Sequence, residues 1–157
     1  MTCMKIVIVR HGEKDDKDQN LSPRGHTRAF ALGSALQLQY GTADFVFASK
    51  NSKISDRPVE TITPYAKTIG KKIRTMFPDS DHKKLAKKLA KAKYDGKTVV
   101  ICWHHGTIPE LITALGATPP YKKWPEEIFD RIIELDFSGS LVMTNKPQKL
   151  LFGDTEV

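Results

Sequence analysis

The sequence contains few cysteines and no long apolar segment. Cys3 and Cys102 are the two cysteines among 157 residues, which is too few for a disulfide framework, so we expect reduced thiols and a cytoplasmic location. No apolar run approaches the roughly 18 residues that identify a membrane-spanning helix. The first run, residues 4–9, is too short for a secretory signal, and we therefore expect no membrane partner.

The chain also lacks internal repeats, low-complexity linkers and the glycine-rich phosphate loop of Walker-type nucleotide hydrolases. A single domain covering residues 1–157 is expected, because a chain of this length can bury a core without metal or disulfide support. The net charge of +7 fits an anionic partner, but a basic total also serves solubility, which is the interpretation we favour.

Short apolar runs alternate with segments of helical periodicity. Strands are predicted at residues 5–9, 44–48 and 98–103, followed by a hairpin of residues 131–137 and 141–146. Helices are predicted at residues 23–40, capped by Ser22 and ended by Gly41, and at residues 58–69, 82–94 and 109–115. This order predicts an α/β fold, a three-layer α/β/α sandwich whose central sheet is mostly parallel with an antiparallel edge.

The predicted helix at residues 82–94 has an apolar stripe and a lysine stripe. The apolar positions are Leu85, Ala86, Leu89 and Ala92, and the basic positions are Lys84, Lys87, Lys88 and Lys91. A lysine face of this kind can dock an anion or simply face solvent, and we favour the solvated face. No aromatic residues interleave with the lysines, so no nucleic-acid partner is expected.

Basic side chains and histidines follow the predicted strands directly. Arg10 and His11 come after the first strand, His104 and His105 come after the strand at residues 98–103, and Arg57 lies at the start of a helix. Because ligands bind beyond the carboxyl ends of parallel strands, these groups are expected to converge. Arginine matches phosphate oxygens, and a neutral imidazole can accept a phosphoryl group, so the set indicates phosphoryl chemistry.

Four pieces of sequence resemble the histidine phosphatase superfamily, which includes phosphoglycerate mutases and phosphohistidine phosphatases. They are residues 9–14, residues 21–25, Arg57 with Glu60 and Thr61, and residues 99–111. The resemblance implies that His11 is the nucleophile and forms a phosphohistidine intermediate. It further implies that Arg10, Arg57 and His104 line the phosphate pocket.

The leaving group needs a proton donor, and a carboxylic acid is the usual one. Asp79, Asp81 and Glu13 are the candidates, although acidic residues after a proline are also natural first-turn residues of a helix. The segment between Arg57 and His104 is short and offers little material for a lid, which favours hydrolysis over a mutase reaction.

The spacing of residues after the strand at residues 98–103 favours His104 over His105 as the catalytic histidine of the resemblance. In the superfamily pattern, two small residues stand between this histidine and a Thr or Ser that opens the next helix, and counting back three positions from Thr107 gives His104. His105 then takes a position usually held by a small residue, where we expect it to point away or line the pocket rim.

The sequence therefore predicts a metal-independent phosphatase that hydrolyses a phosphomonoester or phosphoramidate and needs no cofactor. The expected partner is a phosphorylated small molecule or phosphoprotein, with specificity set by the loops at residues 14–20 and 118–124. The alternatives are a mutase-type phosphotransferase, a non-catalytic phosphoprotein-binding module, and a metal site made of His11, His104 and His105.

Overall fold

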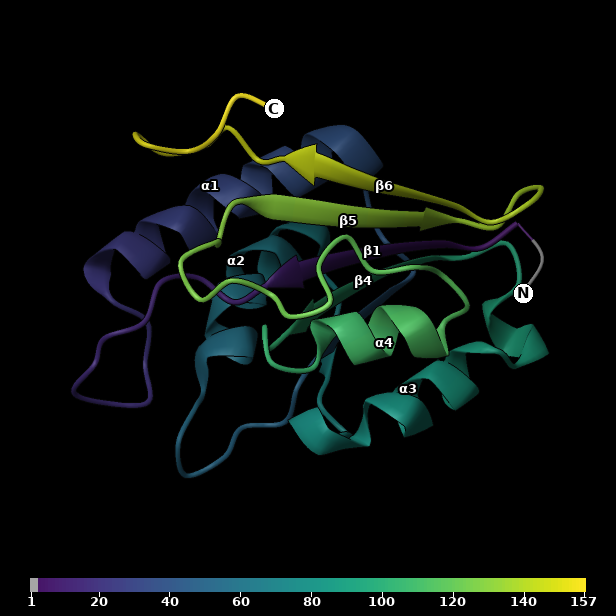
Figure 1. Ribbon diagram of the computed structural model, residues 1–157, viewed down its shortest axis with the longest axis horizontal. Coiled ribbons are helices and arrows are strands. Elements are labelled where there is room, and N and C mark those ends of the chain that lie inside the picture. Colours follow the sequence, from purple (N-terminus) through teal and green to yellow (C-terminus); the bar gives the residue numbers. More distant parts are fainter. Residues whose placement is uncertain (1–2) are drawn as a thin grey trace.

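Alternate side chains of the first strand point to opposite faces of a sheet, and both sets are buried and apolar. In β1 (Lys5–Arg10), Ile6 and Ile8 belong to one buried cluster, whereas Val7 and Val9 belong to another. A strand that is apolar on both faces must be covered on both faces. The computed structural model, which describes residues 3–157, accordingly has helices on both sides of one sheet (Figure 1).

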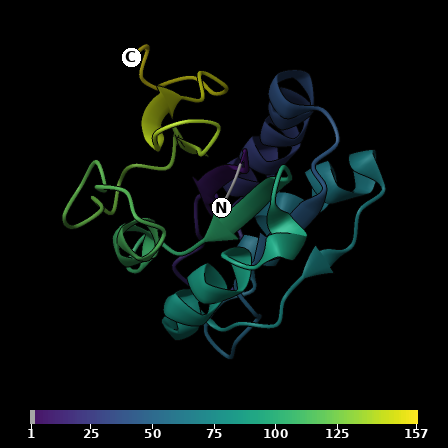
Figure 2. The ribbon, with the colours of Figure 1, turned by 90° about the vertical axis from the view of Figure 1, so that its right-hand side faces the viewer.

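The sheet contains six strands in the order β3-β2-β4-β1-β5-β6. Its first four strands are parallel to one another, and the last two add an antiparallel edge. Figure 2 shows β6, in yellow, and the teal segment with β3 at opposite edges. The strands after β1 are β2 (Phe45–Ala48), β3 (Ile73–Arg74), β4 (Thr98–Trp103), β5 (Arg131–Asp136) and β6 (Val142–Pro147).

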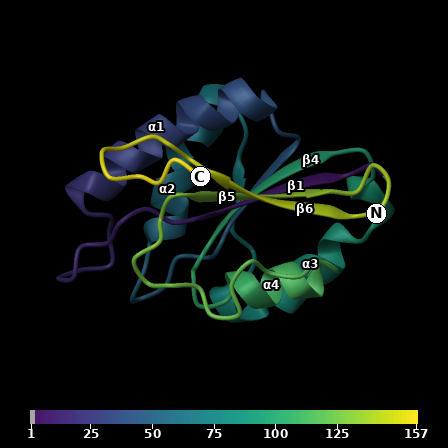
Figure 3. The same cartoon turned by 45° about the horizontal axis from the view of Figure 1, so that its top comes forward.

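Two pairs of helices cover the two faces. The first pair is α1 (Pro23–Tyr40) with α2 (Arg57–Ile69), and the second pair is α3 (His82–Leu89) with α4 (Ile108–Ala114). Leu32 and Ile62 pack with Val7 on one face, whereas Leu85 and Leu111 pack in the cluster of the other face. Figure 3 shows the sheet between these two layers, so the predicted three-layer α/β/α sandwich is confirmed.

The predicted helix at residues 82–94 is wrong in its second half. Helix α3 ends at Leu89, and Lys91 adopts an extended conformation before a short 3-10 turn, Ala92–Tyr94. The ring of Tyr94 is buried and packs edge-on against Phe45 with ring centroids 4.8 Å apart. The helix ends where this ring packs against a distant strand, and the sequence has no helix-breaking residue at this point. Ala92 is exposed as a result.

Strand β3 is absent from the sequence prediction, because two residues are too short to show a period of two. A 3-10 turn, Asp79–Asp81, also precedes α3 without having been expected. Within residues 3–157, none of the helices combines the length and the apolar character that crossing a membrane requires.

A buried arginine joins three distant parts of the chain. Arg28, on α1, is 2% exposed and donates two hydrogen bonds to the Glu13 carboxylate and two to the Asp154 carboxylate. Burial raises the pKa of Asp154, but the hydrogen bonds from Arg28 and the backbone lower it more, to about 2. The network therefore fastens the C-terminal segment and the loop after β1 to the same helix.

We expect Arg28→Met to lower the free energy of unfolding by about 3 kcal/mol, because the Asp154 carboxylate, 4% exposed, would lose its two hydrogen bonds from Arg28 and keep only the more distant Arg24, at 3.7 Å, as a cationic partner. Arg24→Met is the matched control, since Arg24 is 47% exposed and pairs with the same Glu13. Its loss should cost less than about 1 kcal/mol. Urea denaturation of both variants measures the difference, and equal losses would contradict this account.

Candidate active site

A cleft of about 560 Å³ opens at the carboxyl ends of β1, β2 and β4. This position follows from the parallel sheet, in which the strand-to-helix connections meet at one edge. The cleft brings together five of the predicted site residues, Arg10, His11, Arg57, Asp79 and His104, and further residues come from the loop between β2 and α2. The lining includes Arg10, His11, Lys14, Ser49, Lys50, Lys53, Ile54, Arg57, Asp79, His104 and His105.

Two glycines allow the loop after β1 to pass against the first turn of α1. A Cβ atom on Gly25 would lie 2.2 Å from the Glu13 carbonyl oxygen, and one on Gly12 would lie 2.9 Å from the Gly25 carbonyl oxygen. Ser22 caps α1 by accepting the Gly25 N–H, and its own N–H donates to the Glu13 carbonyl at 2.9 Å. The two sequence pieces around residues 11–13 and 22–25 thus form one unit.

His11 is buried with one fixed tautomer. Its side chain is 2% exposed, and Nδ1 lies 2.7 Å from the Gly12 carbonyl oxygen. A carbonyl only accepts, so Nδ1 carries the hydrogen and the lone pair is on Nε2. Burial lowers the pKa of His11 to about 3; the Gly12 carbonyl opposes this, while His104, Arg10 and Arg57 add to it. The imidazole is therefore neutral and nucleophilic at neutral pH.

Arg10 is buried, with part of its guanidinium fixed by neighbouring groups and part left without a partner among the described residues. Nη1 donates to the carbonyl oxygens of Glu126 at 2.7 Å and Ile128 at 2.8 Å, and the guanidinium stacks on Phe129 at 3.7 Å from the ring centroid. Nε and Nη2 are buried and have no hydrogen-bond partner among the described residues. Burial lowers the pKa of Arg10 to about 10, so it stays charged. Two unsatisfied donors on a fixed cation suit a phosphate oxygen.

Arg57 begins α2 and is oriented by the loop at residues 14–20. Nη2 donates to the Asp18 carbonyl at 2.7 Å and Nε donates to the Asn20 carbonyl at 3.2 Å. Thr61, one turn later, donates to the Arg57 carbonyl and accepts the Gly12 N–H, both at 2.8 Å. The second predicted arginine is thereby tied to the loop that carries His11.

His104 is the first residue beyond β4, as the sequence frame predicts, and its ring centroid lies 5.2 Å from that of His11. Burial lowers the pKa of His104, the Asp79 charge opposes this, and Arg57 and Arg10 reinforce it. His105 lines the cleft and also a neighbouring cavity beside Trp124, so it forms the ridge between them. This position agrees with the expected place on the pocket rim.

The three candidate acids lie in different environments. Asp79 lines the cleft and accepts a hydrogen bond from the Thr107 hydroxyl at the start of α4. Asp81 lies outside the cleft lining and pairs with the exposed Lys84 at 3.2 Å. Glu13 also lies outside the cleft: burial raises its pKa, but hydrogen bonds from Arg28 and Arg24 outweigh this and lower it. The expectation that Glu13 donates the proton is therefore corrected, since it is an ionised member of the structural network.

The site includes residues that sequence reasoning missed. Ser49 directly follows β2 and lines the cleft; it is 1% exposed, and its hydroxyl has no hydrogen-bond partner among the described residues. Its place directly after a strand is the signal that could have found it. Phe129 and Arg28 gave no such signal, because their contacts with Arg10 and Glu13 join segments distant in sequence.

The alternative of a metal site is not supported by the arrangement of ligands. Within residues 3–157, no group of three or more His, Cys, Asp or Glu side chains is placed so that it could hold a metal ion. His11, in particular, uses Nδ1 for the Gly12 carbonyl, and the arginines Arg10 and Arg57 line the same cleft.

Comparison with solved structures identifies the fold. A phosphoserine phosphatase from Entamoeba histolytica, crystallised with 3-phosphoglyceric acid, matches with a TM-score of 0.66 and 18% identity over 94% of this chain and 100% of that chain. The protein histidine phosphatase SixA, complexed with tungstate, matches with a TM-score of 0.64 and 16% identity over 92% and 97%. A Plasmodium falciparum phosphoglycerate mutase matches with a TM-score of 0.65 and 17% identity over 100% and 98%.

These proteins share the histidine phosphatase fold, and this chain has that fold as well, which confirms the resemblance in the sequence. No model of a protein family matches the sequence, and no curated protein matches it. At 16–18% identity the likeness establishes the fold, and the activity must be argued from the cleft itself.

We expect the His11 imidazole to remain neutral, with its hydrogen on Nδ1, from pH 7.5 down to at least pH 5. A pKa of about 3 lies well below the unfolded value of about 6.5, so protonation is shifted to lower pH. Two-bond ¹⁵N–¹H NMR spectra of the free protein report both tautomer and charge. The same histidine in urea-unfolded protein is the control, and half-protonation of folded His11 near pH 6.5 would contradict the assignment.

Proposed function

We propose that this protein is a metal-independent phosphatase that hydrolyses a phosphomonoester or phosphoramidate through a phosphohistidine on His11. The observation that carries the proposal is the hydrogen bond from His11 Nδ1 to the Gly12 carbonyl, which leaves a lone pair on Nε2 in a cleft lined by two arginines. The fold shared with a phosphoserine phosphatase and with SixA supports the same class of reaction.

In the first step, the Nε2 lone pair of His11 forms a bond to phosphorus, and the bond from phosphorus to the leaving oxygen or nitrogen breaks. Arg10 and Arg57 bind the phosphoryl oxygens, and the two unpaired donors of Arg10 are available for this contact. His104 donates an N–H to the same oxygens, where negative charge gathers in the transition state. The leaving atom takes a proton from the carboxyl group of Asp79.

In the second step, a water molecule attacks the phosphohistidine. Its proton passes to the Asp79 carboxylate, a bond forms between the water oxygen and phosphorus, and the bond from phosphorus to Nε2 breaks. Inorganic phosphate and neutral His11 result, and the proton taken from water balances the one given to the leaving atom in the first step.

A phosphotransferase of the mutase type is the second candidate, favoured by the likeness in fold to a phosphoglycerate mutase. The two reactions share the first step and differ in what accepts the phosphoryl group. Release of inorganic phosphate in buffer without an acceptor supports hydrolysis, whereas turnover that requires a phosphorylated acceptor supports transfer.

We expect His11→Ala to lower turnover of 4-nitrophenyl phosphate at least about 1000-fold, because the nucleophile is removed. Rapid quenching of the wild type during turnover with ³²P-labelled substrate should trap phosphate on His11 in an acid-labile, base-stable form. His26→Ala is the control, since His26 is half-exposed and lies outside the cleft. Activity should persist in EDTA; full loss there, or full activity of His11→Ala, would refute the mechanism.

We expect Asp79→Asn to affect substrates according to their leaving groups. Hydrolysis of an alkyl phosphate, whose leaving oxygen needs a proton, should slow about 100-fold, while 4-nitrophenyl phosphate should slow less than tenfold. Asp81→Asn, outside the cleft, is the matched control and should leave both rates near wild type. Equal slowing of both substrates by Asp79→Asn would assign Asp79 to binding or positioning instead of proton donation.

A further inference from the structure

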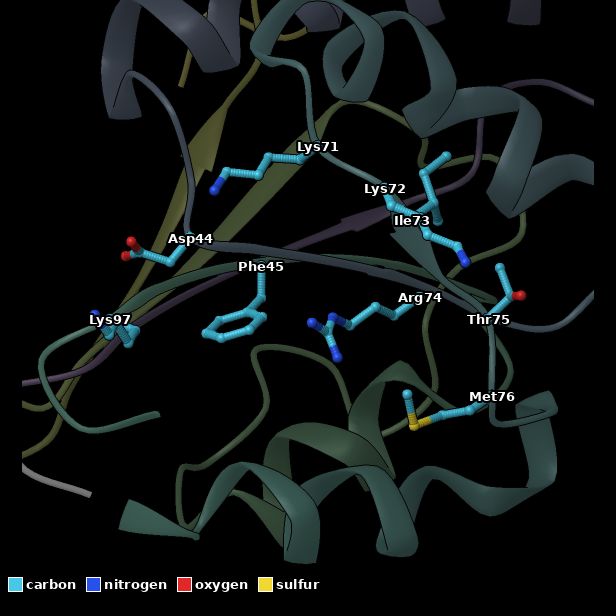
Figure 4. Close-up of a pocket in the computed structure, with 9 residues that line it drawn as sticks. All are labelled: Asp44, Phe45, Lys71, Lys72, Ile73, Arg74, Thr75, Met76 and Lys97. Atoms are coloured by element: carbon cyan, nitrogen blue, oxygen red, sulfur yellow. The ribbon is translucent and has the colours of Figure 1, made fainter. Parts of the chain in front are cut away.

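A second concave region lies at the sheet edge formed by β3, and it is larger than the catalytic cleft. Its volume is about 750 Å³, against about 560 Å³ for the cleft, and the two share no lining residue. We call it the basic groove. It is lined by Asp44, Phe45, Lys71, Lys72, Ile73, Arg74, Thr75, Met76 and Lys97 (Figure 4).

The basic groove is away from the chemistry. Phe45 is the first residue of β2, and Lys97 immediately precedes β4, so these residues mark the amino ends of the parallel strands. His11 and His104 follow the carboxyl ends of β1 and β4. Thr75 and Met76 follow β3, so the groove extends along this edge of the sheet from the amino ends of β2 and β4. His11 and His104 do not line it, so a ligand in the groove need not react.

The charge of the groove is unbalanced. Four of its side chains are basic and one is acidic, and the acidic one, Asp44, already accepts the Thr98 N–H at 2.9 Å. Among residues 3–157, no carboxylate lies within ion-pair distance of Lys71, Lys72 or the other two basic groups. The groove consequently favours an anionic occupant.

The wall of the groove is an open strand edge. Strand β3 is the first in the sheet order and pairs only with β2, through Ile73 and Arg74. An edge strand presents unpaired N–H and C=O groups that an extended peptide can join as a further strand. Lysines beside such an edge discourage pairing with neutral or basic strands, and the same charge selects an acidic one.

The aromatic residue of the groove does not offer a free stacking surface. Arg74 extends from β3 over the Phe45 ring at 4.9 Å from its centroid (Figure 4), Lys93 lies 5.5 Å from the same centroid, and Tyr94 packs on the ring edge-on. Single-stranded nucleic acids bind through bases stacked on open aromatic rings. A peptide that uses main-chain pairing needs no such surface.

We propose that the basic groove binds an acidic, extended segment of a partner protein, which adds to β3 as a further strand. Main-chain hydrogen bonds to the outer edge of β3 give the pairing, and contacts of Glu or Asp side chains with Lys71, Lys72 and Arg74, on and just before β3, give the selectivity. This proposal does not depend on the catalytic activity proposed above.

The first test uses a fluorescein-labelled peptide of eight alternating Glu and Val residues and measures fluorescence anisotropy. The double variant Lys71→Glu, Lys72→Glu should weaken binding at least tenfold, since both side chains are exposed groove residues. The matched control is Lys87→Glu, Lys91→Glu, which makes the same charge change on exposed lysines outside the groove. It should weaken binding less than threefold; equal weakening by both, or no binding to the wild type, overturns the proposal.

The second test asks whether main-chain pairing is used. Two further peptides carry N-methyl groups at all Glu or at all Val positions, so that each blocks the N–H groups on one edge of the added strand. One of the two should bind at least tenfold more weakly than the parent, and the other should bind within threefold of it. Unchanged affinity of both overturns strand addition.

A competition experiment and a folding check complete the design. A single-stranded RNA of eight nucleotides should displace the peptide poorly. If the RNA displaces the peptide at concentrations below the peptide's own Kd, and if the variant Lys71→Glu, Lys72→Glu no longer binds the RNA, the groove is a nucleic-acid site and the proposal is overturned. Both double variants should keep the wild-type circular dichroism spectrum and the wild-type rate on 4-nitrophenyl phosphate. A loss of that rate in the groove variant alone would contradict the separation of groove and cleft.

Discussion

The backbone contact between the loop after β1 and the first turn of α1 is the constraint on which the candidate active-site cleft depends. Gly12 and Gly25 approach so closely that neither tolerates a Cβ atom without a shift of the backbone. This approach lets Ser22 bond to the Glu13 carbonyl and cap α1 at the same time. The Gly12 peptide thereby receives a fixed orientation, and its carbonyl in turn selects the tautomer of His11.

The electrostatics of the cleft suit a nucleophile that meets a dianion. Burial and the nearby arginines both disfavour the imidazolium form of His11, so the free cleft keeps its nucleophile neutral. In the proposed reaction, a bound phosphoryl group would offset the charge of Arg10 and Arg57. Arg10 and Arg57 therefore help to keep His11 neutral, and they also give the cleft a positive charge that an anionic substrate would balance.

Local signals predict the elements that local chemistry determines. Helix α1 has the expected bounds because Ser22 caps it and Gly41 ends it, and β4 spans residues 98–103 because an apolar run is bounded by a turn. The placement of Arg10, His11, Arg57 and His104 in one cleft follows from strand ends. Long-range contacts gave no signal: Arg10 donates to carbonyls more than 100 residues away, and Arg28 meets Asp154 across 126 positions.

Strand β2 connects the two basic regions of the molecule. Its first residue, Phe45, lines the basic groove, and Ser49, just after its last residue, lines the catalytic cleft. Four steps of extended chain span about 13 Å, a distance that a short peptide covers easily. A phosphoprotein with an acidic segment near its phosphorylated residue would therefore be held at two points. Docking in the groove would raise the local concentration of the phosphoryl group at His11 without altering any group that takes part in the reaction.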